Sequence, residues 1–116
     1  MDFNIHIPKP LLVVLNQIYE IDQKAKKAGD PVNIQRNVNK IKDAFEEYGL
    51  SYEDPLGQPF KETRTDLEAT ISGQGTENLV VVEVIKPIIR IKIREGSGEF
   101  TKIIQKGIVI VESKQH

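Results

Sequence analysis

The sequence predicts an α+β protein in which an N-terminal helical hairpin is followed by a small all-β domain. Up to about residue 50, apolar residues recur every three or four positions, as they do on one face of a helix. Beyond residue 66 the chain is rich in Val and Ile and alternates with polar residues, which is typical of strands. We therefore expect a hairpin over residues 1–50, a connector over 51–66 and a β-domain over 67–116.

Composition excludes several classes of protein. The chain has 116 residues, of which 39% are hydrophobic and 28% charged, as expected for one globular unit or two small subdomains. Its net charge of -1 provides no field that attracts nucleic acid or an anionic membrane. The absence of cysteine excludes disulfides, thiolate zinc sites and cysteine nucleophiles, and fits a reducing compartment. With no long apolar run and no secretory signal, we expect a cytoplasmic protein.

The first helix has a signal at each end. Pro10 is placed where the first helical turn tolerates proline, three lysines near the far end complement the helix dipole, and Gly29 stops the helix. The apolar stripe between these ends is formed by Leu11, Val14, Ile18, Ile21, Ala25 and Ala28.

The second helix is predicted to start near Asp30 as N-cap, with Pro31 at the first helical position and Gly49 as its C-terminal stop. Each helix carries more apolar surface than one partner helix covers. The surplus either packs against the strand half of the same chain or joins two hairpins from two chains into a four-helix bundle. In the second case the predicted dimer interface contains Leu11, Val14, Leu15, Ile18, Ile21, Ile34, Val38, Ile41 and Phe45.

The strand half predicts four or five short strands, enough for a small barrel or a two-layer sheet. One strand is expected over residues 67–71. Residues 79–93 are read as two strands because Pro87 must lie at an edge, bend or bulge. A loop over 95–98 leads to a last strand over 102–111. In the second of the two middle strands, Arg90, Lys92 and Arg94 face away from the neighbouring isoleucines.

A search for catalytic chemistry finds little. The two histidines, His6 and His116, lie near the termini, where a triad or metal cluster is rarely held rigidly. Asp66 and Glu68 resemble an acid/base pair, but are better explained as a solvated strand face because nothing suggests their burial. The glycines at 73–75 and 96–98 match no phosphate-binding fingerprint. We therefore expect no catalytic residues, no metal and no cofactor.

The order of several short segments resembles the GrpE-type nucleotide exchange factors. Residues 9–18 are similar to that family's "ELLPVLDNLERAL" segment, and residues 41–50 to its "vLkkfGV" helix end. A Gly-x-Pro-Phe turn follows at 57–60, and residues 68–69, 81–86 and 102–111 resemble the later strand motifs. The sequence departs from the family at Leu67, where the family has His, and at Pro87, where it has Gly. The family's long N-terminal paired helix has no counterpart, as expected of a compact relative or a piece of a longer protein.

The resemblance implies a homodimer joined through the helical hairpins, whose β-domains bind the ATPase domain of a DnaK-type chaperone and promote ADP release. It also implies the contact residues, which are Ile108 as the apolar residue pressed into the chaperone, its neighbours Gln105, Lys106, Gly107, Lys86, Pro87 and Ile88, and Gly49 at the helix end. Two of these residues also have a purely structural explanation. Ile108 is equally expected in a β-core, and Gly49 is equally expected as an ordinary helix C-cap.

Two rival hypotheses remain open at this point. One is a dimeric protein-interaction adaptor with the same architecture and no exchange activity. The other is a small-molecule-binding or catalytic β-barrel, which the lack of Cys and Trp and the two terminal histidines disfavour.

Overall fold

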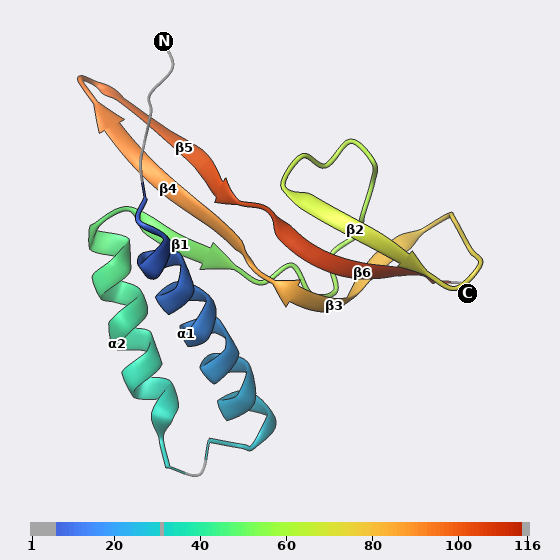
Figure 1. The fold of residues 1–116 in the computed structure, drawn as a ribbon, viewed down its shortest axis with the longest axis horizontal. Helices are drawn as coiled ribbons and strands as arrows, with labels where there is room; N and C mark the ends of the chain where they lie inside the picture. Colours follow the sequence, from blue (N-terminus) through green and yellow to red (C-terminus); the bar gives the residue numbers. More distant parts are fainter. Residues whose placement is uncertain (1–6, 31, 115–116) are drawn as a thin grey trace. The chain divides into compact units, whose positions relative to one another are not determined.

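The computed structural model describes residues 7–30 and 32–114, and it divides the chain into two compact units, Met1–Glu47 and Tyr48–His116. Within the described residues, the first unit contains two helices and the second contains six strands (Figure 1). The α+β class is therefore confirmed. None of the helices in the described ranges is long and apolar enough to cross a membrane.

Helix α1 spans Lys9–Lys27 and has both predicted ends. Pro10 lies in its first turn, and the chain leaves the helix at Gly29, whose φ is +74°. The amides of residues 28–30 donate to the carbonyls of the last turn, the shortest of these bonds joining Asp30 N to Ala25 O at 2.8 Å. A glycine is suited to this position because a left-handed residue closes the helix end without Cβ strain.

Helix α2 spans Ile34–Glu47, so it begins later than the predicted start near Asp30. Asp30 and Asn33 both have positive φ, 52° and 57°, which is incompatible with a helix running through them. Asp30 still caps the helix, because Oδ1 accepts from Ile34 N at 2.6 Å and Oδ2 accepts from Gln35 N at 3.1 Å. Pro31, the predicted first helical residue, lies outside the described residues.

A buried carboxylate ties the two helices together. Asp22 of α1 is only 1% exposed, and its Oδ1 accepts from Gln35 Nε2 of α2 at 2.7 Å. Lys26, one turn further along α1, places its Nζ 3.4 Å from the other carboxylate oxygen. A buried charge is tolerated only when it is paired and hydrogen-bonded in this way.

The predicted dimer interface divides into two sets. Leu15, Ile18 and Val38 are buried within the single chain, and Phe45 is partly buried. The other five residues are between 37% and 44% exposed, namely Leu11, Val14, Ile21, Ile34 and Ile41. Both helices therefore present exposed apolar residues on the predicted stripe, and we call these five residues the hairpin patch.

The six strands form two three-stranded sheets. Sheet A has the order β1 (Leu50–Glu53), β4 (Ile88–Glu95), β5 (Gly98–Gln105), with both pairs antiparallel. Sheet B has the order β2 (Leu67–Ser72), β6 (Gly107–Ser113), β3 (Leu79–Lys86). In sheet B, β2 runs parallel to β6, whereas β3 runs antiparallel to it with two register shifts.

Two predicted boundaries were wrong. The last strand, expected over 102–111, is two strands in different sheets, because the chain leaves β5 at Lys106 and enters β6 at Gly107. The segment expected to be a connector, 51–66, contains most of β1, which pairs with β4. The predicted break at Pro87 is present, since β3 ends at Lys86 and β4 begins at Ile88.

The breaks at Pro87 and Lys106 fall side by side. Strands β3 and β4 form one ribbon that passes from sheet B into sheet A, and β5 and β6 form a second ribbon that passes back beside it (Figure 1). We call the crossing point, residues 86–88 and 105–107, the strand joint.

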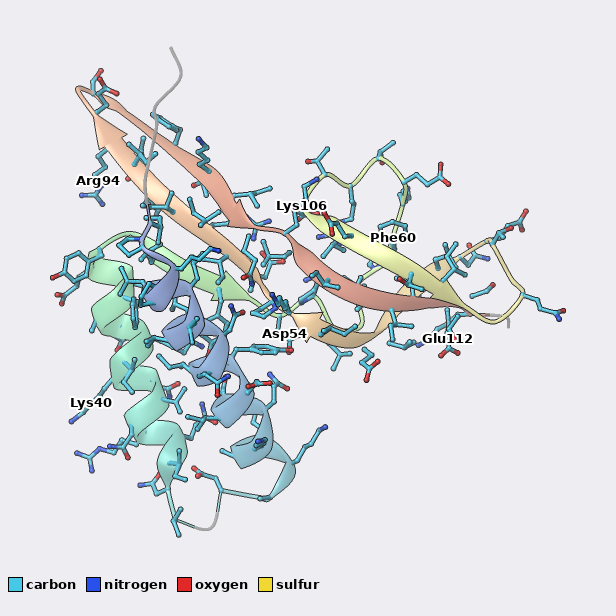
Figure 2. The ribbon with its side chains drawn as sticks, viewed as in Figure 1. Lys40, Asp54, Phe60, Arg94, Lys106 and Glu112 are labelled. Atoms are coloured by element: carbon cyan, nitrogen blue, oxygen red, sulfur yellow. The ribbon has the colours of Figure 1, made fainter. Side chains whose placement is uncertain are left out.

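The main core of the β-unit lies on one face of sheet B. Its buried members alternate along the strands, as expected when one side of a sheet is covered. Phe60 of the segment after β1, labelled in Figure 2, packs against this cluster together with Ala69 and Val84. The buried cluster itself consists of Leu67, Leu79, Val81, Ile88, Val109 and Val111.

Candidate partner-binding site

Six of the eight predicted contact residues meet at the strand joint. Gln105 Nε2 donates to the carbonyl of Pro87 at 2.9 Å, which links the two crossing ribbons. Gly107 N donates to Asp66 O at 2.9 Å, which connects the joint to the start of β2. The sequence resemblance therefore selected residues from two distant segments that the fold brings together.

Three of these residues are interior. Pro87 and Ile88 are essentially inaccessible, and Gly107 is buried. A Cβ at position 107 would lie 2.8 Å from Leu67 Cδ2 and 3.0 Å from Ile88 Cγ1, so glycine is required by the close approach of these two side chains. Pro87, Ile88 and Gly107 thus shape the joint from inside and are not available to touch a partner.

The two lysines of the joint face solvent. Lys86 and Lys106 are exposed, and neither makes an ion pair among the residues that the structure describes. Lys106 is labelled where β5 passes into β6 in Figure 2. Two cations therefore flank the crossing point on the surface.

Ile108 lies on the outer face of sheet B, opposite the core. Along β6, the residues Gly107, Val109 and Val111 are buried, whereas Ile108 and Ile110 are only partly buried. Register pairs Ile108 with Glu68 of β2 on one side and with Lys86 of β3 on the other. Directly paired residues point to the same face, so Ile108 lies between a carboxylate and an ammonium group.

Gly49, the eighth predicted contact residue, lies away from the joint. It follows α2 with φ of +84°, and its carbonyl accepts from Lys92 N of β4 at 2.8 Å. A Cβ here would lie 2.5 Å from the Lys92 carbonyl oxygen. Both the backbone conformation and the close approach require glycine, which gives Gly49 a structural role.

A ring of polar side chains lies beside the joint, and sequence reasoning did not find it. Arg64 donates from Nε and Nη2 to the two carboxylate oxygens of Asp66, both at 2.9 Å, and from Nη1 to Gln58 Oε1 at 3.0 Å. Arg90 donates to Asp66 Oδ2 at 2.9 Å and pairs with Glu53.

Gln58 Nε2 closes this ring by donating to Glu53 Oε2 at 3.2 Å. We call these five residues the ion-pair ring. It joins β1 and β4 of sheet A to the residue that precedes β2 of sheet B. Its members are scattered over nearly forty positions of sequence, so no local motif marks them.

The ring keeps Asp66 ionised. Its side chain is 17% exposed, and the hydrogen bonds from the Arg64 guanidinium hold the pKa of the Asp66 carboxyl below its ordinary value despite the opposing effect of burial. The same bond raises the pKa of Arg64. The description of Asp66 as part of a solvated strand face was wrong, whereas Glu68 is exposed as expected. A lowered pKa suits an ion-pair partner rather than a general acid.

The basic row is also largely neutralised. Arg90 belongs to the ion-pair ring, and Arg94 Nε lies 2.9 Å from Glu99 Oε2 across the β4–β5 hairpin. Lys92 lies 3.8 Å from the same carboxylate. These cations therefore do not form a free positive surface.

A polar hollow of about 620 Å³ lies at the far end of sheet B. The Ser113 hydroxyl donates to the Glu77 carbonyl there, and Lys114 N donates to Asn78 O at 3.0 Å. Residues 74–78, Ser113 and Lys114 line it. Over the described ranges, no three of the His, Cys, Asp and Glu side chains gather as a metal site would require. His6 and His116 lie outside those ranges.

Comparison with known proteins gives no relative. No family model matches the chain, and neither a curated protein nor a solved structure matches it.

Proposed function

We propose that this chain is a nucleotide exchange factor that binds the ATPase domain of a cytoplasmic DnaK-type chaperone and promotes ADP release. The observation that carries the proposal is the position of Ile108, an incompletely buried apolar residue on the outer face of sheet B beside Lys86. The order of elements, a helical hairpin followed by a β-unit, agrees with what the sequence resemblance implies.

Exchange of this kind needs no catalytic side chain. A protein that binds the open form of a nucleotide cleft more tightly than the closed form shifts the population toward the open form, from which ADP leaves. ATP binding then expels the exchange factor by reciprocity. Shifting the equilibrium from 1:99 to 99:1 takes about 5.5 kcal/mol of differential affinity, which requires an apolar contact surface in addition to a few charges.

The decisive experiment measures release of a fluorescent ADP analogue from a purified DnaK-type chaperone of the same organism. We expect release to accelerate with the concentration of this protein and ATP to dissociate the complex. An unchanged rate of ADP release at a saturating concentration of this protein would contradict the proposal that it is an exchange factor.

The second candidate function is a protein-interaction adaptor that has the same architecture and no exchange activity. It is favoured by the burial of Pro87, Ile88 and Gly107, which removes three expected contact residues from the surface. A complex with the chaperone that leaves ADP release unchanged, or binding to another protein through the same face, would support it.

Replacing Ile108 with Ala is expected to slow stimulated ADP release about tenfold, because it removes a central apolar contact. The matched control is Val109→Ala on the next position of β6, where the side chain is 1% exposed and faces the core. That change should cost about 2 kcal/mol of folding stability through the cavity it leaves. Melting temperature and release rate measured on both variants separate the two roles. Equal effects of the two changes on release would contradict the assignment.

We further propose that two chains associate through the hairpin patch to form a four-helix bundle. Ile21→Lys would place a charge in the contact between chains and is expected to weaken the dimer about 100-fold. Val13→Lys is the matched control, because Val13 is 58% exposed on the same helix and is not one of the hairpin-patch residues. Sedimentation velocity reports both. A wild-type chain that remains monomeric at high micromolar concentration contradicts this proposal.

A further inference from the structure

The outer edge of β2 differs from the other strand edges of the β-unit. An edge strand presents unpaired N–H and C=O groups, and proteins usually protect such edges with bulges, prolines, lysines or short strands. On the opposite side of sheet B, β3 has two register shifts, and residues 57–60 hydrogen-bond to its outer edge. In sheet A, β1 is four residues long, and β5 carries Lys102.

Strand β2 has none of these protections. It pairs with β6 in unbroken register over Leu67–Ser72, and its sequence LEATIS contains no Pro, Gly or Lys. Its exposure increases toward the end, where Thr70, Ile71 and Ser72 are all exposed.

Hydrogen-bond alternation identifies the groups on this edge. Gly107 N donates to Asp66 O, and in a parallel ladder the residues that bond the neighbouring strand alternate. Glu68, Thr70 and Ser72 therefore face β6 with their backbone groups, whereas Ala69 and Ile71 present N–H and C=O on the outer edge. Among the described residues, no further backbone bond to either is found.

Side chains determine which strand would fit. Ala69 and Ile71 lie on the core face of sheet B, and Ile71 is 44% exposed, so an added strand would cover it with apolar residues. On the outer face, Glu68 lies on β2 itself and Glu112 is paired with Ser72. Lys86 on the same face is separated from β2 by the whole of β6.

We propose that β2 is a docking edge that receives an extended segment of a partner protein as a fourth strand of sheet B. The segment would alternate apolar residues, which pack beside Ala69 and Ile71, with Lys or Arg residues, which face Glu68 and Glu112. Main-chain hydrogen bonds would supply affinity, and the acidic outer face would select a basic strand. This inference does not depend on exchange activity.

The test uses the synthetic peptide Thr-Val-Lys-Val-Lys-Val with a fluorescein label, titrated with the full chain and followed by fluorescence polarisation. Two N-methylated versions carry methyl groups on alternate backbone nitrogens. Only the nitrogens that face β2 take part in the ladder, so one version should lose binding and the other should keep it.

The protein variants address the same edge. Ala69→Pro removes an outward N–H while leaving the ladder with β6 intact, and should weaken binding at least about tenfold. Glu68→Lys should also weaken binding, whereas its matched control Glu83→Lys, the same charge change on the outer face of β3, should not. Backbone amide spectra establish whether each variant is folded. If Ala69→Pro does not fold, the two N-methylated peptides still test whether binding uses the β2 edge.

Three results would overturn the proposal. They are the absence of binding at millimolar peptide, equal binding of the two N-methylated versions, and undiminished binding by a folded Ala69→Pro variant. Dimerisation without peptide that Ala69→Pro abolishes would instead assign this edge to a second copy of the chain, also overturning it. Because ADP release plays no part in these measurements, failure here leaves the exchange proposal standing.

Discussion

Gly49→Ala is expected to destabilise the protein by at least about 2 kcal/mol, which combines left-handed backbone strain with overpacking. The added Cβ would lie 2.5 Å from the Lys92 carbonyl oxygen, and neither backbone can yield without breaking the bond between Lys92 N and Gly49 O. For a chain of this size the melting temperature should fall by about 8 °C or more.

The matched control for this change is Gly73→Ala. Gly73 has the same φ of +84°, yet a Cβ there meets nothing within 4 Å. The difference between the two variants therefore isolates the clash with β4 from the backbone strain, which should cost about 1 kcal/mol by itself. Equal melting temperatures for the two variants would show that the close approach is not maintained in solution.

Asp66→Asn is expected to cost about 1 to 3 kcal/mol at neutral pH, because it leaves Arg64 and Arg90 without a shared carboxylate. The pH dependence has a definite sign. Since the folded-state pKa of Asp66 lies below its ordinary value, the stabilisation is complete near neutral pH and is lost as the pH falls through the folded-state pKa. The difference in stability between wild type and variant should therefore shrink in acid.

Urea unfolding of both proteins at several pH values measures this difference. Glu68→Gln serves as the control, because Glu68 is exposed and its replacement should change stability by less than about 0.5 kcal/mol. A gap between wild type and Asp66→Asn that stays constant down to the most acidic pH would disprove the role of the ring.

Local signals in the sequence predicted the two helices and strands β2, β3 and β4. The proline at position 10 and the glycine at 29 identified α1, and Pro87 identified the break between β3 and β4. The start of α2 was misplaced because Asp30 caps Ile34 from four residues away, and Asp30 and Asn33 both have positive φ. A sequence shows which residue can cap a helix, but it does not show the loop conformation that brings the capping side chain to the first helical turn.

Features that depend on long-range pairing were not predictable. Residues 102–111 were predicted as one strand, and only the pairing with two different neighbours shows that the chain changes sheets at Lys106. The sequence of β1 has no strand signal of its own, and this segment is recognised as a strand only through its pairing with β4. The ion-pair ring is assembled from four segments, so its members resemble ordinary surface charges in the sequence.

The paired ribbons of the β-unit also imply an order of folding. The β4–β5 hairpin closes over a two-residue turn at 96–97, so its loop closure has the lowest entropic cost of any strand pairing in the unit. Strand pairing that propagates from that turn reaches the strand joint and continues into the β3–β6 pair. Strand β2 then joins β6 in parallel, across three intervening strands of sequence. The docking edge we propose thus lies on a strand whose only pairing is distant in sequence, and its amides should exchange with solvent faster than those of the hairpin.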